Sequence, residues 1–372
     1  DYIYVADGND VKALIKAFEG VKDYPRPIAV HIHTVKGKGL AFAEQNPEKY
    51  HAGGPFDIKT GKYLYDSDEK DYGDIVSDYL LEKMKKDASV VAITSGTPSV
   101  FGFTPEKRKK AGKQFVDVGI AEETAAALAS GIAKNGGKPV WGVFSTFVQR
   151  TYDQISQDIC INKSPVTVLV FGGASDFLKD VTHLGFFDIP LLSNIPELLY
   201  LAPTNCEELL AMTEWSLEQT SRPVAIRVPF NVTHAKTPVR TNYDNPCYEI
   251  AQRGEKIAVL AVGNFWQLGE KLCAEIEKRS GVKPTLINPV FVSGTDDKTL
   301  DELKKNHDKI VTLEDGVKDG GFGQKIADFY ARDDVKVYAY GLKKQFEDRY
   351  DHAELLRRNR LTTEQIIEDL GL

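Results

Sequence analysis

The chain has 372 residues, and at about 150 residues per domain this length predicts two or three domains, each able to bury a core. Its net charge of −7 argues against a general nucleic-acid or anionic-membrane surface. The composition, 42% hydrophobic and 27% charged, is that of an ordinary globular protein, and no apolar run reaches the ~18 residues of a membrane span. We therefore expect a protein that binds neither nucleic acid nor membrane.

The first 62 residues look like the end of a domain. The opening DYIYVADGND has neither an initiator Met nor the basic and apolar regions of a signal or transit peptide. Residues 9–18 have helical spacing, residues 27–33 have a strand pattern, and the loop at residues 51–62 is typical of a connector. We expect residues 1–62 to close a domain that begins upstream in a longer protein.

Helix and strand patterns alternate from residue 72 onwards. The β-branched and apolar runs predict strands at 90–94, 139–146, 165–171, 198–202 and 223–228, with a helix over 119–133. A linker rich in Pro, Asn and Asp follows at 233–246, and four more strands are expected at 256–263, 283–292, 309–314 and 335–340. This order predicts the α/β class, with a parallel sheet in residues 63–240 and a smaller parallel sheet in residues 241–372.

The cysteines and histidines give no metal or disulfide signal in the sequence. The chain has four widely spaced cysteines without a C-x-x-C pair, which are Cys160, Cys206, Cys247 and Cys273. His31 and His33 alternate on a predicted strand and so share a face, but no third ligand is in view and we interpret them as structural. We predict no metal-ligating residue, and a reducing cytoplasm is the expected location.

Two short motifs carry an unusual density of chemical groups. DVGIAEE at residues 117–123 places two adjacent carboxylates at the start of an Ala-rich helix, where acids also complement the helix dipole. FSTFVQRTYDQ at residues 144–154 collects aromatic and charged side chains, as many strand ends do before a capped helix. Each motif on its own has a structural interpretation.

The two motifs together, with THLGFFD at residues 182–188, resemble the pyrimidine-binding domain of the 1-deoxy-D-xylulose-5-phosphate synthase family. That family lies in the transketolase superfamily of thiamine diphosphate enzymes. VADGND, HIHTVKGKG and YHAGGPFD near the start, LAPTNCEELLAM at residues 201–212 and TLEDGVKDGGFG at residues 312–323 extend the resemblance along the chain. It implies the end of a diphosphate-binding domain at 1–62, a pyrimidine-binding domain at 63–240 and a transketolase C-terminal domain at 241–372.

The resemblance also implies roles for individual residues. Glu122 matches the carboxyl that hydrogen-bonds N1′ of the cofactor, and the aromatic Phe147, with Phe144 before it, matches the ring that stacks on the pyrimidine. His51 and His183 match catalytic histidines. The residues expected at the substrate are Arg150, Tyr152 and Lys179.

Three positions depart from the family pattern. Gly172 and Phe230 stand where the resemblance implies arginines that clamp the phosphate of glyceraldehyde 3-phosphate, and Lys179 stands in place of an Asp. Each lost charge-assisted contact typically contributes on the order of 1.5 to 3 kcal/mol of binding free energy. Lys179 could replace part of this loss. The acceptor substrate could therefore be a molecule other than glyceraldehyde 3-phosphate.

The family motif that binds the cofactor's diphosphate through a divalent metal, GDG followed by Asn, does not occur in these residues. The resemblance thus implies that a missing N-terminal half, on the same or a separate chain, holds the diphosphate and Mg²⁺. With it, a homodimeric transferase is expected to move a two-carbon unit from pyruvate to glyceraldehyde 3-phosphate, a step of isoprenoid biosynthesis. The alternatives are a transketolase-type enzyme with another donor or acceptor, and a non-catalytic assembly or regulatory subunit.

Overall fold

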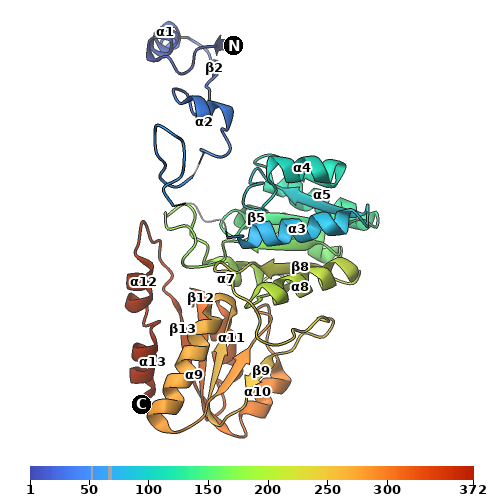
Figure 1. Cartoon of the computed structure of the whole chain (residues 1–372), viewed down its shortest axis with the longest axis vertical. Coiled ribbons are helices and arrows are strands. Elements are labelled where there is room, and N and C mark those ends of the chain that lie inside the picture. The colour runs from blue at the N-terminus through green and yellow to red at the C-terminus, as the bar shows by residue number, and fades with distance from the viewer. Residues whose placement is uncertain (52, 66–68) are drawn as a thin grey trace. The chain divides into compact units, whose positions relative to one another are not determined.

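The computed structural model describes residues 1–51, 53–65 and 69–372. The chain forms two compact units, Asp1–Glu69 and Lys70–Leu372 (Figure 1). Within the described residues, no helix combines the length and the apolar composition that crossing a membrane requires.

The first unit contains a small βαβ arrangement. Strands β1 (Tyr2–Val5) and β2 (Ala29–Ile32) pair in parallel, and helix α1 (Val11–Val21) connects them. The Asp10 side chain caps α1 by accepting a hydrogen bond from the backbone N–H of Lys12. The expected helix and strand are confirmed, whereas β1 was not predicted. A short helix, α2 (Ala41–Gln45), follows.

A six-stranded sheet, parallel throughout, forms the first part of the second unit. The strand order is β4-β3-β5-β6-β8-β7. The strands are β3 (Val90–Thr94), β4 (Phe115–Asp117), β5 (Lys138–Phe144), β6 (Thr167–Phe171), β7 (Leu199–Leu201) and β8 (Val224–Arg227). Every residue of β6 is buried, as expected for a parallel sheet covered by helices on both faces.

Helices pack against this sheet through their apolar sides. The longer ones are α3 (Tyr72–Met84), α5 (Glu122–Lys134) and α8 (Cys206–Glu218), while the mostly charged helix α4 (Pro105–Ala111) packs against α3. Short helices α6 (Tyr152–Gln154) and α7 (Asp188–Leu192) lie in the connections after β5 and β6. Polar residues fix the helix starts, since Asn205 accepts a hydrogen bond from the backbone N–H of Glu208 at the beginning of α8.

The second sheet is mixed, which corrects the expectation of a wholly parallel one. Its order is β13-β12-β10-β11-β9, and β9 (Glu249–Gln252) alone runs antiparallel to its neighbour. Only residues 253–255 connect β9 to the next strand, which is too short to return the chain to its starting end, so β9 runs opposite to that strand and to β11, which lies between the two. The parallel strands are β10 (Lys256–Ala261), β11 (Thr285–Asn288), β12 (His307–Val317) and β13 (Lys336–Leu342). The helices are α9 (Trp266–Ser280), α10 (Asp297–Leu303), α11 (Phe322–Phe329), α12 (His352–Arg358) and α13 (Thr363–Leu370).

A buried ionic cluster joins the two sheets. Arg227, the last residue of β8, donates from Nε to Asp188 Oδ2 at 2.7 Å and from Nη1 to Asp315 in β12. All three side chains are at most 2% exposed. The Tyr200 hydroxyl donates a further hydrogen bond to Asp188. The cluster therefore fixes the ends of β7 and β8 against the second sheet.

Candidate active site

The candidate site residues of the second unit follow the carboxyl ends of the parallel strands. Glu122 follows β4, Phe144 ends β5, Gly172 follows β6 and Phe230 follows β8. The carboxyl ends of parallel strands share one edge of the sheet, where α/β proteins bind ligands. The fold thus gathers motifs that lie more than 100 residues apart in the sequence along a single edge.

Glu122 is a buried carboxyl with unused hydrogen-bonding capacity. It begins α5 and is 1% exposed, whereas its neighbour Glu123 is 43% exposed at the side chain. Arg150 Nη1 lies 3.0 Å from Glu122 Oε2, although the angles are not those of a hydrogen bond. Within the described residues, this buried oxygen has no hydrogen-bond partner.

Four phenylalanines and a histidine form a chain of ring contacts, here called the aromatic row. The ring centroids of Phe230 and Phe177 are 5.4 Å apart, and those of Phe177 and Phe144 are 5.5 Å apart. Phe144 contacts Phe147 at 5.3 Å, edge to face, and Phe147 contacts His183 at 5.5 Å. The row crosses the edge in the order of strands β8, β6 and β5, so apolar surface dominates this part of the site.

A carboxylate orients the His183 ring. His183 Nδ1 lies 3.0 Å from Asp180 Oδ1, and the Thr182 hydroxyl donates to the same oxygen. These hydrogen bonds, the one from Thr182 first, lower the pKa of Asp180 to about 2. No hydrogen bond reaches Nε2 of His183 within the described residues. The imidazole is held in place with one nitrogen available for a substrate.

Two other predicted site residues, Lys179 and Tyr152, have polar side-chain partners that belong neither to the pair of Glu122 and Arg150 nor to the aromatic row. Lys179 Nζ forms an ion pair with Asp176 Oδ1 at 2.9 Å. The Tyr152 hydroxyl accepts a long hydrogen bond, 3.4 Å, from Asn194, just beyond α7. His51 belongs to the first unit and is exposed. The recorded contacts therefore join Arg150 to Glu122, and Phe144 and Phe147 to His183, but not Tyr152, Lys179 or His51 to either group.

The sequence analysis missed three residues that shape this edge. Phe177 links two predicted positions through its ring, and nothing in the sequence marks it. Asn264, from the second sheet's domain, accepts from the backbone N–H of Phe230 at 2.8 Å and donates to the carbonyl of Gly173 at 3.2 Å. Asp180 lies three residues before His183, a spacing that could have indicated the pair.

The structure explains why no side chain stands at position 172. Gly172 has φ +70°, and a Cβ atom there would lie 2.5 Å from the Phe177 ring. An arginine at this position is incompatible with the present place of Phe177. At the end of β6, the Phe177 ring thus occupies the space that an arginine side chain at position 172 would need.

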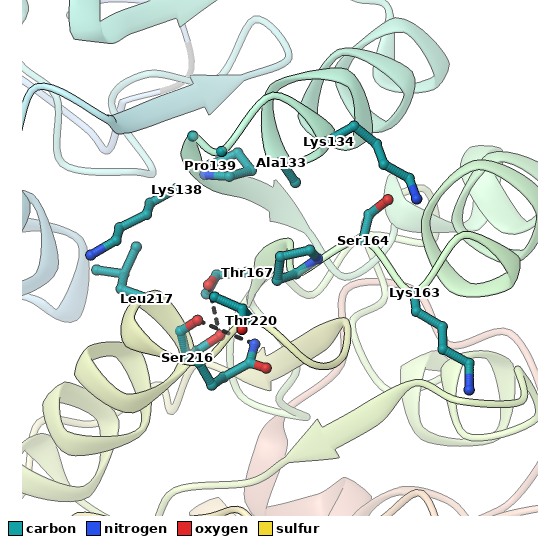
Figure 2. Close-up of a pocket in the computed structure, with 14 residues that line it drawn as sticks. Ala133, Lys134, Lys138, Pro139, Lys163, Ser164, Thr167, Ser216, Leu217 and Thr220 are labelled. Carbon is teal, nitrogen blue, oxygen red and sulfur yellow. Dashed lines mark hydrogen bonds between the residues drawn. The ribbon is translucent and has the colours of Figure 1, made fainter.

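A pocket of about 390 Å³ lies at the opposite edge of the same sheet, where β5 and β6 begin (Figure 2). None of the predicted site residues lines it. Two of its three lysines are paired with acids, since Lys138 pairs with Asp87 and Glu218 and Lys163 with Glu197, while Lys134 donates to a backbone carbonyl. The charges of Lys138 and Lys163 are therefore already balanced by acids.

Comparison with protein families identifies both parts of the second unit. Residues 68–233 match the transketolase pyrimidine-binding domain, and residues 248–366 match the transketolase C-terminal domain. Among solved structures, a split-gene transketolase, described as an inactive β4 tetramer, superposes with a TM-score of 0.70 and 18% identity. The alignment covers 82% of this chain and 98% of that one. A Pichia stipitis transketolase variant gives a TM-score of 0.65 at 14% identity, over 82% of this chain and 46% of the other.

Curated relatives give the same result with higher identity. The 1-deoxy-D-xylulose-5-phosphate synthase of Caldanaerobacter subterraneus is 36% identical over 95% of this chain and 56% of its own length. The enzyme of that name from Alkaliphilus oremlandii is 35% identical over 99% of this chain and 59% of its own length. The chain thus spans little more than half the length of these relatives. It belongs to the transketolase superfamily and is similar, along nearly its whole length, to 1-deoxy-D-xylulose-5-phosphate synthases.

Proposed function

We propose that this chain is the pyrimidine-binding and C-terminal part of a thiamine-diphosphate-dependent transferase. Joined to a diphosphate-binding half, it would take a two-carbon unit from pyruvate, with loss of CO₂, and attach it to glyceraldehyde 3-phosphate. The product would be 1-deoxy-D-xylulose 5-phosphate, an isoprenoid precursor. The observation that carries the proposal is the buried Glu122 carboxyl, whose Oε2 atom has no hydrogen bond within the described residues.

The residues at this edge fit the aminopyrimidine end of the cofactor. Glu122 Oε2 has the charge of Arg150 nearby but no hydrogen bond, and a protonated ring nitrogen would supply that missing bond. Phe147 is partly buried and carries a flat apolar face, which suits stacking on a heteroaromatic ring. Phe144 packs edge-on against Phe147 and would hold that ring in place.

Each side chain has a defined task in this proposal. Thiamine diphosphate, when bound, supplies a carbon nucleophile at C2 of its thiazolium ring. Glu122 would hold a proton at N1′ of the aminopyrimidine, and Arg150, 3.0 Å away, would balance the carboxylate charge while facing the substrate. His183, oriented by Asp180, would exchange a proton with a substrate oxygen.

Three further residues complete the proposed substrate environment. Tyr152 and Lys179 would contact the substrate at the entrance, and His51 would act as a second proton-transfer group once the first unit joins its other half. Lys179 is 40% exposed and its ion pair with Asp176 is therefore readily opened to an incoming anion.

The partner in this proposal is the half that holds the diphosphate and Mg²⁺, on the same or a separate polypeptide. Residues 1–62 would complete its domain, followed by the pyrimidine-binding domain at 63–240 and the C-terminal domain at 241–372. Helix α1 supports this view, because it buries none of its residues and exposes Val11, Ile15 and Phe18 at helical spacing. A cytoplasmic homodimer of the completed enzyme is the expected form.

Reconstitution tests the proposal. The chain is co-expressed with a diphosphate-binding half and given Mg²⁺, thiamine diphosphate, pyruvate and glyceraldehyde 3-phosphate, while CO₂ and the deoxysugar phosphate are followed together. Stoichiometric formation of both products is expected. Formation of neither, from an assembly shown to contain both halves, would contradict the proposal and favour a non-catalytic subunit.

A second candidate acceptor is favoured by the aromatic row. Where the resemblance implies two arginines, the structure has Gly172 and Phe230, and the ring of Phe177 fills the space between them. The nearby Arg227 is fully occupied by Asp188 and Asp315. An uncharged aldehyde with an apolar substituent would match this surface better than a phosphate dianion.

The acceptor preference is measured in the same reconstituted assay. Parallel reactions with glyceraldehyde 3-phosphate, glyceraldehyde and benzaldehyde, at constant pyruvate, give kcat/KM for each. The second candidate predicts a higher value for an uncharged aldehyde and a rise for the phosphorylated one in Phe230→Arg. A higher value for glyceraldehyde 3-phosphate in the unaltered chain would exclude it and leave the first proposal standing.

A further inference from the structure

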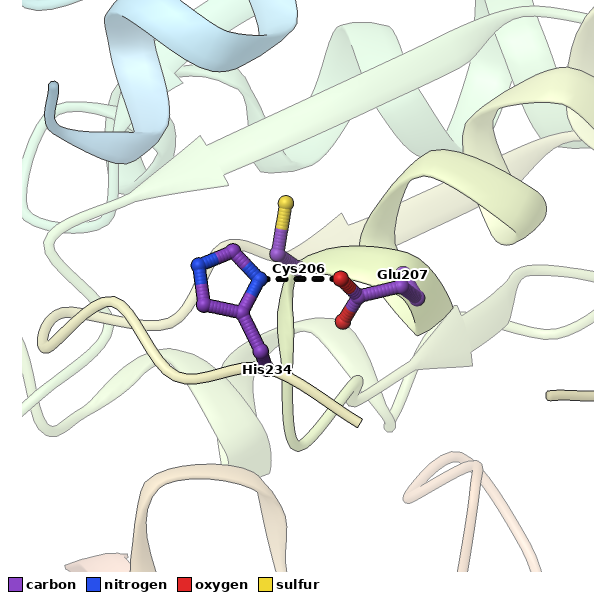
Figure 3. A group of neighbouring side chains, drawn as sticks. All are labelled: Cys206, Glu207 and His234. Carbon is purple, nitrogen blue, oxygen red and sulfur yellow. Dashed lines mark hydrogen bonds and ion pairs between the residues drawn. The ribbon is translucent and has the colours of Figure 1, made fainter. Parts of the chain in front are cut away.

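Three potential metal ligands converge away from the Glu122 side of the sheet. Cys206 and Glu207 form the first turn of α8, and His234 comes from the segment after β8 (Figure 3). One ligand atom from each, sulfur, oxygen and nitrogen, lies within 4.8 Å of the other two. This group stands at the β7 end of the sheet, whereas Glu122 follows β4 at the other end.

Backbone hydrogen bonds hold the two segments together. The N–H of Cys206 donates to the carbonyl of Thr233 at 2.9 Å, and the Thr233 hydroxyl donates to the carbonyl of Thr204 at 3.0 Å. The N–H of Ala235 donates to Glu207 Oε2 at 2.7 Å. The three side chains are therefore brought close by the fold itself, which lowers the entropic cost of binding an ion between them.

The donor set suits zinc. A thiolate, an imidazole and a carboxylate are the ligands that Zn²⁺ takes in proteins, and three protein ligands leave a fourth tetrahedral position for water. Bonds of about 2.0 to 2.3 Å require the ligand atoms to be roughly 3 to 4 Å apart. His234 and Glu207 can make this small approach by rotation, since their side chains are 68% and 42% exposed, while Cys206 is buried and fixed.

The charges of the free group are compatible with binding a cation. Glu207 Oε2 accepts the Ala235 N–H, and Glu207 Oε1 lies 2.9 Å from His234 Nδ1. A carboxyl is ordinarily ionised at neutral pH, and a thiol ligand gives up its proton when it binds zinc.

We propose that Cys206, Glu207 and His234 bind one Zn²⁺ per chain. The ion would tie the segment that leads to the second sheet onto the start of α8, as a structural clasp. Cys206 and His234 are 28 residues apart in a spacing typical of no zinc motif, which is why the sequence analysis predicted no metal ligand. The inference does not depend on the proposed enzymatic function.

Titration of the chain, freed of any affinity tag, tests the proposal. Zn²⁺ is added in a calorimeter, and Co²⁺ is added separately to detect the thiolate-to-metal charge-transfer absorption. We expect one Zn²⁺ per chain, with affinity reduced about tenfold or more in Cys206→Ser and in His234→Ala. The cobalt charge-transfer band should be present in the unaltered chain and absent in Cys206→Ser.

Matched controls separate this group from other donors. Cys247→Ser removes the exposed cysteine, and His33→Ala removes the exposed histidine just after β2. Both variants should bind zinc as the unaltered chain does. Thermal melts without metal show whether each variant is folded, and His234→Ala removes a mostly exposed side chain, so its folding should be unaffected. No zinc binding, equal binding by Cys206→Ser and His234→Ala, or loss of binding in a control would overturn the proposal.

Discussion

At the scale of single residues, environment separates side chains that the sequence places next to each other. Glu122 and Glu123 are adjacent and identical in type, yet the first is 1% exposed and the second is 43% exposed at the side chain. Only the buried carboxyl can offer a cofactor a hydrogen bond away from competing water. Helix phase at the start of α5 therefore decides which of the two acids is available for chemistry.

The fit of Phe177 over Gly172 gives a stability prediction. Gly172→Ala forces a left-handed backbone on an L residue and sets its Cβ 2.5 Å from the Phe177 ring, so we expect a loss of about 1 to 3 kcal/mol in unfolding free energy. Gly131→Ala, in α5 with open space around it, should stabilise the protein slightly. Urea unfolding compares the two. Equal stability of both variants would contradict the packing described.

Glu314 predicts a pH dependence of stability. It is fully buried, accepts hydrogen bonds from the N–H groups of Phe322 and Gly323, and burial raises its pKa from 4.5 to about 7. Between these values the folded protein keeps a proton that the unfolded chain has lost, so stability falls as the pH rises to about 7 and then levels.

The variant Glu314→Gln removes this titration. Unfolding free energies measured from about pH 5 to about pH 8 should therefore show the unaltered chain losing a few kcal/mol relative to Glu314→Gln. Glu364→Gln, at an exposed position, should follow the unaltered chain at every pH. Parallel curves for Glu314→Gln and the unaltered chain would show that Glu314 has no raised pKa.

Among the secondary-structure elements, fully buried strands were easier to predict than half-buried ones. Val90–Thr94 was predicted to the residue, because a buried parallel strand reads as one continuous apolar run. The half-buried strands β1 and β9 carry no such run and were missed. The site was predicted where a motif is local, as at Glu122, but Phe177 and Asn264 reach it through tertiary packing that no spacing in the sequence reveals.

The ionic cluster between β8, α7 and β12 predicts a large mutational effect. Arg227→Met leaves Asp188 and Asp315 buried without their partner, which typically costs about 3 to 5 kcal/mol. Arg357→Met removes an exposed ion pair with Glu354 and should cost less than about 1 kcal/mol. Denaturant unfolding distinguishes them. Similar small losses of unfolding free energy in both variants would mean that the ionic cluster does not stabilise the packing of the two sheets.

At the scale of the whole molecule, the two units differ in how much core they have. The second unit buries two hydrophobic clusters around its sheets, whereas helix α1 of the first unit buries none of its residues. A two-stranded sheet with one unburied helix is marginal by itself. The first unit is thus expected to gain stability from a partner that covers the α1 face.

Hydrogen exchange measures this directly. In the chain alone, backbone amides of α1 should exchange much faster than those of the inner strands β5 and β6, which are almost wholly buried. Addition of the diphosphate-binding half should slow exchange in α1 and leave β5 and β6 unchanged. Strong protection of α1 in the chain alone, or none after addition, would contradict the proposed assembly.

One pair of variants tests the proposed role of Glu122. In the reconstituted assembly with thiamine diphosphate and pyruvate, the rate of CO₂ release is measured for Glu122→Gln and Glu123→Gln. Loss of the buried acid should lower kcat by roughly 10² to 10⁴, while loss of its exposed neighbour should change it little. An unchanged kcat in Glu122→Gln, in an assembly of normal stability, would contradict the account.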